Sequence, residues 1–174
     1  MRWTRLAAIR LTVAAAATLA TGVVTLRIAD SRARAAEAQH PPSGEVVDVG
    51  GTRVHALIQG SGPDLVLIHG AFGSLKDFTY DLMPRLAERY RVIAFDRPGL
   101  GYTERTDDAY DRAFAQRGES PAEQAALLAA AARKLGADRP IVVGHSFGGS
   151  VAMAWALEHD PAGVVMLAGV AMPW

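Results

Sequence analysis

Residues 141–160, IVVGHSFGGSVAMAWALEHD, decide the fold of this chain. A short apolar run leads into GHSFG (144–148), and a stretch typical of a helix follows at 150–160. A strand that reverses into a helix this tightly strains the backbone at Ser146 and leaves no room for side chains two residues before and after it. Gly144 and Gly148 meet that need, so the pattern predicts Ser146 as a nucleophile at a helix N-terminus, where developing negative charge is stabilised. The alternative is a tight turn with an inert serine.

Patterns of strands and helices precede and follow this turn. Two β-type runs, 45–50 and 52–60, meet at Gly50-Gly51 and predict a hairpin. Continuous apolar runs predict buried strands at 64–70, 91–96, 139–145 and 163–172. Helices are expected at 74–90, 120–136 and 150–160, with end signals at Ser74, Asp77, Ser120, Pro121, Glu123 and Gly136. This order predicts an α/β fold with a mainly parallel sheet and helices on both faces.

Three glycine-rich turns follow predicted strands, and the carboxyl ends of parallel strands share one edge of a sheet. They are HGAFGS (69–74), DRPGLG (96–101) and GHSFGG (144–149). Acyl transfer requires two preorganised donors for an oxyanion. We expect the backbone amides of Phe147 and Ala71 to supply them, with Phe72 as the next candidate for the second donor. His69 is expected to brace its loop and Asp96 to tie down its turn, and a catalytic role is the alternative for each.

Aromatic side chains near these turns suggest a wall for a substrate. They are Phe72, Tyr102 and Phe147. Ordinary core packing is the alternative for each of the three rings.

The composition of the 174 residues excludes several classes of site. The chain has no cysteine, so it forms no disulfide, thiolate metal site or cysteine nucleophile, and no metal site of another kind is predicted. It contains 18 basic and 18 acidic residues, which argues against a nucleic-acid binder. The charge is uneven, because residues 1–40 carry six arginines against Asp30 and Glu37, a net charge of +4 that residues 41–174 balance.

The N-terminal segment 1–40 differs in kind from the remainder. Three arginines in its first ten residues precede an uncharged run, 11–26, which extends to residue 29 if Arg27 snorkels. We expect residues 11–29 to be a membrane anchor, or a secretory signal with AEA (36–38) as its cleavage site. A soluble amphipathic helix is the further alternative. Similar positive charge on both sides leaves the orientation open.

The three turns, in this order and on these elements, resemble the α/β-hydrolase superfamily over about residues 45–174. The resemblance implies a cofactor-independent serine hydrolase acting on a small acyl substrate. It makes Ser146 the nucleophile and the amides of Phe147 and Ala71 the oxyanion hole. Serine rather than aspartate at the elbow argues against the haloalkane dehalogenase and epoxide hydrolase branches. Acyltransferases and cofactor-free haloperoxidases share the elbow and stay open as alternatives.

The expected catalytic acid and histidine are missing from this chain. In the superfamily they follow the serine in the order acid, then histidine. Glu158, His159 and Asp160 lie at the far end of the next helix, about 15 Å from Ser146 for Glu158. The other histidines are expected elsewhere, in the linker (His40), in the hairpin (His55), at the end of a neighbouring strand (His69) and pointing into the fold (His145).

Residues 41–174 are therefore expected to form an incomplete hydrolase domain that stops before its acid and base. A chain of this kind would have very low activity. The alternative from another class is a non-catalytic, membrane-anchored fragment or binding module on the same scaffold. The last strand, 163–172, is expected to leave an uncovered apolar sheet edge through which copies could associate.

Overall fold

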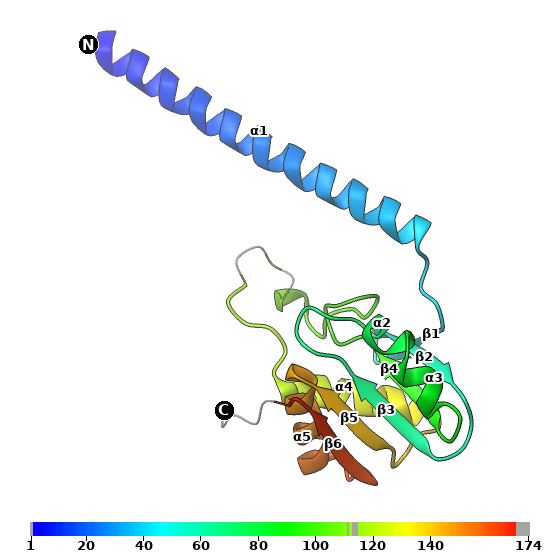
Figure 1. The fold of residues 1–174 in the computed structure, drawn as a ribbon. Coiled ribbons are helices and arrows are strands. Elements are labelled where there is room, and N and C mark those ends of the chain that lie inside the picture. Colours follow the sequence, from blue (N-terminus) through cyan, green and yellow to red (C-terminus); the bar gives the residue numbers. More distant parts are fainter. Residues whose placement is uncertain (1, 111, 113–114, 170–174) are drawn as a thin grey trace. The chain divides into compact units, whose positions relative to one another are not determined.

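The computed structural model describes residues 2–110, 112 and 115–169 (Figure 1), with side chains from residue 10 onward. The chain divides into two units, Met1–Pro42 and Ser43–Trp174. The first unit is built on one helix, α1 (Arg2–Gln39). Within α1, the stretch Arg10–Gln39 contains an 18-residue window with a mean hydropathy of 1.7, so by length and composition the helix could cross a membrane.

The second unit is built on a six-stranded sheet with the order β1-β2-β4-β3-β5-β6. The strands are β1 (Glu45–Val49), β2 (Thr52–Gln59), β3 (Asp64–Ile68), β4 (Arg91–Phe95), β5 (Ile141–His145) and β6 (Gly163–Leu167). The predicted hairpin is confirmed, since β1 and β2 are antiparallel and Gly50 and Gly51 both have positive φ. β3, β4, β5 and β6 run parallel. The sheet is therefore mainly parallel, as predicted.

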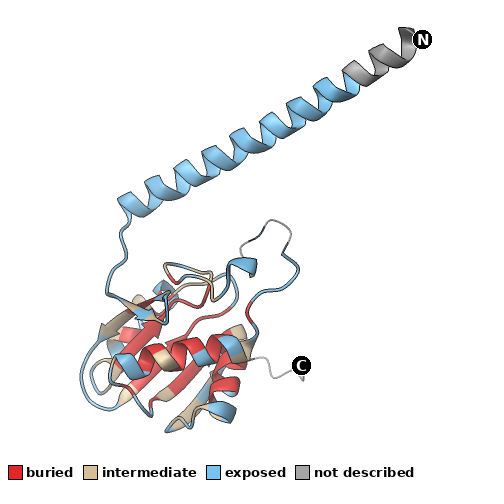
Figure 2. Cartoon of the chain, turned by 180° about the vertical axis from the view of Figure 1, so that it is seen from behind, coloured by how far each residue is buried: buried red, intermediate tan, exposed pale blue. Residues whose placement is uncertain are grey.

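Helices cover both faces of this sheet. On one face α4 (Pro121–Lys134) and α5 (Phe147–Glu158) bury side chains from β2, β3, β4 and β5. On the other face α2 (Lys76–Thr79) and α3 (Leu82–Leu86) pack over β3 and β4. Figure 2 shows the buried residues gathered on the strands and on α4 and α5. This alternation explains why the strands read as continuous apolar runs, since both faces of each are covered.

The prediction of one helix over 74–90 is wrong, because two short helices occupy that segment. Pro84 gives the physical reason. A proline lacks the amide that would bond the carbonyl four residues earlier and collides with that carbonyl, so a helix cannot run through it. Pro84 instead lies in the first turn of α3, where an amide has no intrahelical partner.

The capping box expected at Ser74 and Asp77 is also absent. α2 begins at Lys76 with Leu75 as its N-cap, and no side chain caps it. The Leu75 amide donates to the Asp96 carboxylate at 2.8 Å instead. A contact from a distant turn has replaced the local cap.

The remaining elements differ from prediction mainly in length. α4 begins with the predicted capping box of Ser120 and Glu123, and Gly136 follows it with φ 78°. α5 begins at Phe147, three residues before the predicted start at 150. β6 ends at Leu167, and the part of the predicted strand from 170 to 172 lies outside the described residues. One short 3₁₀ helix, η1 (Asp108–Tyr110), lies in the long connection before α4.

Candidate functional site

Ser146 occupies the predicted reversal between β5 and α5. It has φ 51° and ψ −118°, a backbone conformation that non-glycine residues rarely adopt. Its amide donates to the carbonyl of Leu167 at 2.9 Å, and its own carbonyl accepts from Gly149 at 2.9 Å. These bonds hold the strained residue between β6 and the first turn of the helix.

The two glycines of the turn are required by close backbone contacts. A Cβ at Gly144 would lie 2.2 Å from the carbonyl oxygen of Gly148, within the turn itself. A Cβ at Gly148 would lie 2.2 Å from the carbonyl oxygen of Ile68, at the end of β3. The first glycine therefore allows the reversal, and the second allows α5 to start directly against the neighbouring strand.

Loop 69–74 lies beside the elbow because β3 and β5 are neighbours, paired at Ile68 and Gly144. A Cβ placed on Gly70 would be 3.2 Å from the Cβ of Ser146. Phe72 has φ 58° and a side chain that is 99% exposed. Within the described part of the chain, the amides of Ala71, Phe72 and Phe147 donate no hydrogen bond. The structure thus brings the predicted oxyanion donors close to Ser146 with their amides unoccupied.

A pocket of about 240 Å³ opens beside this loop. The predicted residues Ala71, Phe72 and Phe147 line it. Its other walls are Arg97, Pro98, Leu100, Arg105, Gly118, Glu119 and Gln124. Tyr102 is not among the lining residues, because its ring packs edge-on against His55 with centroids 5.3 Å apart. The pocket combines an apolar wall at Phe72 with charged groups from the segments before α4 and the amide group of Gln124 from α4 itself.

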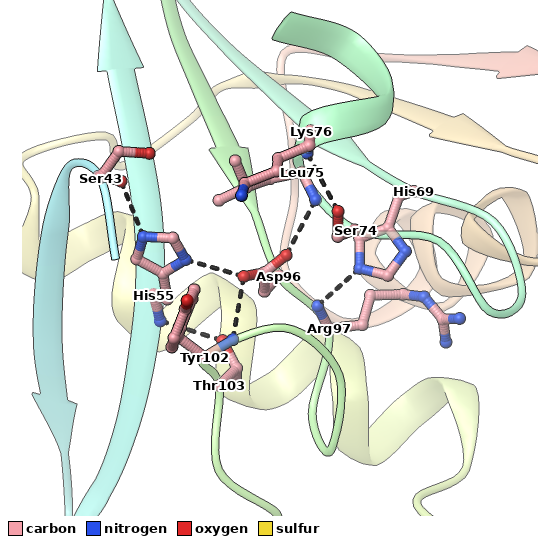
Figure 3. Close-up of polar contacts among 10 residues, drawn as sticks. All are labelled: Ser43, His55, His69, Ser74, Leu75, Lys76, Asp96, Arg97, Tyr102 and Thr103. Atoms are coloured by element: carbon pink, nitrogen blue, oxygen red, sulfur yellow. Dashed lines mark hydrogen bonds and ion pairs between the residues drawn. The ribbon is translucent and has the colours of Figure 1, made fainter. Parts of the chain in front are cut away.

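Asp96 and His69 both lie buried at the ends of their strands and hold the loops around the site (Figure 3). Asp96 accepts hydrogen bonds from the amides of Leu75 and Tyr102, so it ties down its own turn, as expected, and also anchors the start of α2. His69 accepts from the Arg97 amide at Nε2, which leaves the proton on Nδ1 to donate to the Gly70 carbonyl at 2.9 Å. Burial is the main cause that lowers the pKa of His69, so the neutral ring is favoured.

His55 forms a buried pair with Asp96 that no sequence signal indicated. Nδ1 of His55 lies 2.7 Å from the Asp96 carboxylate and Nε2 lies 2.7 Å from the Ser43 carbonyl oxygen, as Figure 3 shows. Both partners are acceptors, so the ring donates from both nitrogens and is an imidazolium. Burial works against that charge, but the bonds to Asp96 and Ser43 outweigh it and raise the pKa of His55.

The carboxylate of Asp96 is the other half of this pair. Burial opposes its ionisation, but the hydrogen bonds led by His55 lower the pKa of Asp96. Its oxygens are occupied by His55 and two amides within the second unit. Both members of the pair are therefore occupied in holding the hairpin and the turns in place.

None of the described histidines hydrogen-bonds to the Ser146 hydroxyl. His69 and His55 have the partners described above. His145 is exposed, so the expectation that it points into the fold is wrong. It continues the face of β5 that carries Ile141 and Val143, but it lies beyond the cluster of side chains that α2 and α3 cover. His159 packs its ring against Trp155 at the far end of α5.

Comparisons with known proteins agree with this geometry. The family model for the α/β hydrolase fold matches residues 63–174. A soluble epoxide hydrolase of Corynebacterium sp. (strain C12) is 34% identical over 111 residues, covering 64% of this chain and 35% of that protein. A fluoroacetate dehalogenase of Burkholderia sp. is 34% identical over 123 residues, covering 71% of this chain and 38% of that protein.

Solved structures extend the similarity to nearly the whole chain. A membrane phospholipase A, described as a novel bacterial virulence factor, matches with a TM-score of 0.64 and 26% identity. That match covers 99% of this chain and 54% of the phospholipase chain. The chain thus spans little more than a third of the two curated relatives. With the hydrolase model matched over 63–174 and the sheet, elbow and loops in the arrangement described, the chain belongs to the α/β hydrolase fold family.

Proposed function

We propose that this chain carries the nucleophile and the oxyanion hole of a serine hydrolase for ester-like substrates. The observation that carries the proposal is Ser146 in its strained conformation beside the unoccupied amides of Phe147 and Ala71. A carbonyl carbon next to Ser146 Oγ would place its oxygen at these amides as negative charge develops. The pocket at Phe72 would receive one side of the substrate.

The reaction proceeds in two acyl-transfer steps. Ser146 Oγ bonds to the carbonyl carbon while its proton passes to a general base and the carbonyl electron pair moves onto oxygen. Collapse of this tetrahedral species breaks the bond to the alcohol, which leaves with that proton. Water then attacks the acyl-serine in the same way and releases the acid.

We further propose that the base and its orienting acid belong to sequence other than these 174 residues. None of the described histidines hydrogen-bonds to the Ser146 hydroxyl, and His55, His69 and His159 are engaged elsewhere. The chain also corresponds to only 35% and 38% of its two curated relatives. On its own, the chain is expected to bind a substrate but to react with it slowly, since serine without a base is a weak nucleophile.

The relatives bear on the substrate class in different ways. In the superfamily that the sequence resembles, the epoxide hydrolase and dehalogenase branches have aspartate at the elbow, whereas this chain has Ser146 there. The phospholipase neighbour acts, by its name, on phospholipids, which supports an ester substrate and a membrane location through α1. A non-catalytic binding module is the second candidate, favoured because no described histidine hydrogen-bonds to the Ser146 hydroxyl.

A fluorophosphonate probe, which forms a covalent bond with activated serines, tests the proposal. Two forms are compared, the 174-residue chain and the longest product of its gene. We expect little labelling of the first, strong labelling of the second, and none after Ser146→Ala. Ser61→Ala is the matched control, because Ser61 is an exposed loop serine between β2 and β3. Labelling that survives Ser146→Ala would refute the nucleophile, and absence of labelling in both forms would favour the binding module.

A further inference from the structure

The peptide group that joins Gly70 to Ala71 is fixed in place by hydrogen bonds to its carbonyl oxygen. The Gly70 carbonyl oxygen accepts hydrogen bonds from two side chains, Arg97 Nη2 at 2.9 Å and His69 Nδ1 at 2.9 Å, and a longer one from the Gly73 amide at 3.4 Å. In a trans peptide the carbonyl and the amide hydrogen point in opposite directions within one plane. Fixing the Gly70 carbonyl therefore fixes the direction of the Ala71 N–H, the second proposed oxyanion donor.

The same guanidinium also contacts the first proposed donor residue. Its central carbon lies 4.8 Å from the centroid of the Phe147 ring, in a cation–π contact. Nη1 of Arg97 donates to Gln124 Oε1 at 2.9 Å, which anchors the side chain to α4. Arg97 thus joins the loop after β3 to the start of α5, the two segments that carry the oxyanion amides.

A stabilising role alone does not account for this arginine. Arg97 is 5% exposed, and its Nε has no hydrogen-bond partner in the part of the chain that the structure describes. Among the described residues no carboxylate is hydrogen-bonded to its guanidinium, so the buried charge is compensated by neutral hydrogen-bond partners, a ring and the longer-range attraction of Glu119. A buried cation in this state costs stability, and an apolar side chain of similar volume would serve packing better. Burial lowers the pKa of Arg97 to about 10, so the charge persists at neutral pH.

We propose that Arg97 is a positioning residue that holds the Ala71 and Phe147 amides at a fixed separation and direction, with His69 as its second support. This inference rests on the proposed function. Donors on the Gly70 carbonyl also polarise that peptide and strengthen the Ala71 N–H as a donor. Arg97 acts through the peptide and does not touch the reacting atoms.

The kinetic test uses the form of the protein that the fluorophosphonate labels. Labelling is measured against probe concentration, which separates probe binding from the covalent step. For Arg97→Met we expect the maximal labelling rate to fall about 10- to 100-fold, the effect of small displacements of catalytic groups. The probe concentration for half-maximal rate should change less than about twofold, because the other residues that line the pocket remain. Arg97→Lys should give an intermediate rate, since it keeps one charged donor but loses the planar fork.

Arg91→Met is the matched control. Arg91 lies at the opposite end of β4, where it pairs with Asp64 and donates to the Leu135 carbonyl at 3.0 Å. Its loss removes comparable polar contacts and lowers the melting temperature, but should leave the labelling rate within about twofold of the wild type. Melting curves of all variants show the temperature range in which each is folded.

A spectroscopic measurement detects the contact between Arg97 and the Gly70 carbonyl independently of fluorophosphonate labelling. In protein labelled with ¹³C′-glycine and ¹⁵N-alanine, only the Gly70–Ala71 and Gly136–Ala137 pairs give carbonyl–amide correlations. Arg97→Met should shift the first signal and leave the second in place. Arg91→Met should do the reverse, because its Leu135 contact adjoins Gly136.

The outcomes separate the two proposals. Labelling that persists in Ser146→Ala, or is absent from every form, refutes the proposed function. Ser146-dependent labelling whose rate is unchanged by Arg97→Met refutes the positioning role of Arg97 alone. An unmoved Gly70–Ala71 signal in Arg97→Met refutes the contact on which that role depends. A selective loss of rate together with a shifted signal supports both proposals.

Discussion

At the scale of single residues, close backbone contacts decide which side chains the second unit, Ser43–Trp174, tolerates. Gly148 lies against the end of β3, where a Cβ would meet the Ile68 carbonyl oxygen at 2.2 Å. Neither partner can move easily, because both belong to the elbow and its supporting strand. Gly163, at the start of β6, has no atom within 4 Å of such a Cβ.

Gly148→Ala is therefore expected to destabilise the fold and Gly163→Ala is not. Overpacking against fixed backbone lowers the free energy of unfolding by about 1–3 kcal/mol or more. Gly163→Ala should change it by less than about 0.5 kcal/mol, as for other unconstrained surface sites. Denaturant melts of both variants measure the difference. Equal losses in the two would show that the contact at Ile68 relaxes without cost.

The buried pair of His55 and Asp96 is the second feature at this scale that determines the stability of the fold. His55→Ala leaves the Asp96 carboxylate buried without its charged partner, and breaking such a pair costs about 3–5 kcal/mol of unfolding free energy. His145→Ala is the control, since His145 is exposed and should change the value by less than about 0.5 kcal/mol. Denaturant melts at pH 6 test both. A small loss in His55→Ala would show that the pair contributes little.

The loss in His55→Ala should also depend on pH. The pKa of His55 is raised above 6.5 in the folded state, so its contribution is complete below pH 6.5 and disappears as pH rises through the folded value. The pKa of Asp96 is lowered below 3.8, so its contribution is present above pH 3.8 and disappears as pH falls through the folded value. The difference between wild type and His55→Ala should therefore be larger at pH 6 than at pH 9. An equal difference at both would contradict a charged His55.

At the scale of elements, α4 shows what local signals can specify. Its capping box satisfies two amides at once, with Glu123 N donating to Ser120 Oγ at 3.2 Å and Ser120 N donating to the Glu123 carboxylate at 2.7 Å. Ser120→Ala should lower the free energy of unfolding by about 1 kcal/mol. Ser61→Ala, in an exposed loop, should leave it unchanged. Thermal melts compare the two, and equal melting temperatures would show that the cap is dispensable.

Local signals also explain which elements could be predicted and which could not. Leu75 and Phe78 are buried, yet Pro84 divides the helix that was predicted over 74–90. The elbow at Ser146 was predictable because its sequence pattern, from Gly144 to Gly148, lies within five residues. The partners of Asp96 and Arg97 were not, because His55 is 41 residues from Asp96 and Gly70 is 27 from Arg97. Contacts of that separation follow from the strand order, which the sequence pattern left open.

The helix α1 is the element that we expect to associate with a membrane. Thr18, Thr21 and Thr25 donate their hydroxyls to carbonyls four residues earlier, so these polar groups are satisfied without water. Arginine in the middle of a spanning helix costs about 2.5–3.5 kcal/mol. The double variant Leu19→Arg and Val23→Arg should therefore lose the membrane fraction in a flotation gradient. Leu157→Arg, on the exposed side of α5, should still float, and flotation of the double variant would contradict an anchor.

At the scale of the whole molecule, the two edge strands of the sheet differ in how they discourage pairing with other chains. β1 carries Glu45 and Asp48, and charges on an edge strand oppose its extension by another strand. β6 contains only glycine and apolar residues, and Val165 and Leu167 are 44% and 36% exposed. The β6 edge is therefore the one through which copies of this 174-residue chain are expected to associate.

Val165→Lys should weaken this association. Pairing of two β6 edges would bring ammonium groups together, and such like-charge contacts should lower the association constant roughly tenfold or more. Val46→Lys is the matched control, since Val46 is a 39% exposed valine on the β1 edge and its replacement should leave association unchanged. Sedimentation velocity of the chain in a mild detergent, at several concentrations, measures the distribution of species. Equal effects of the two substitutions would assign association to another surface, since a β6 interface responds to charge only at its own edge.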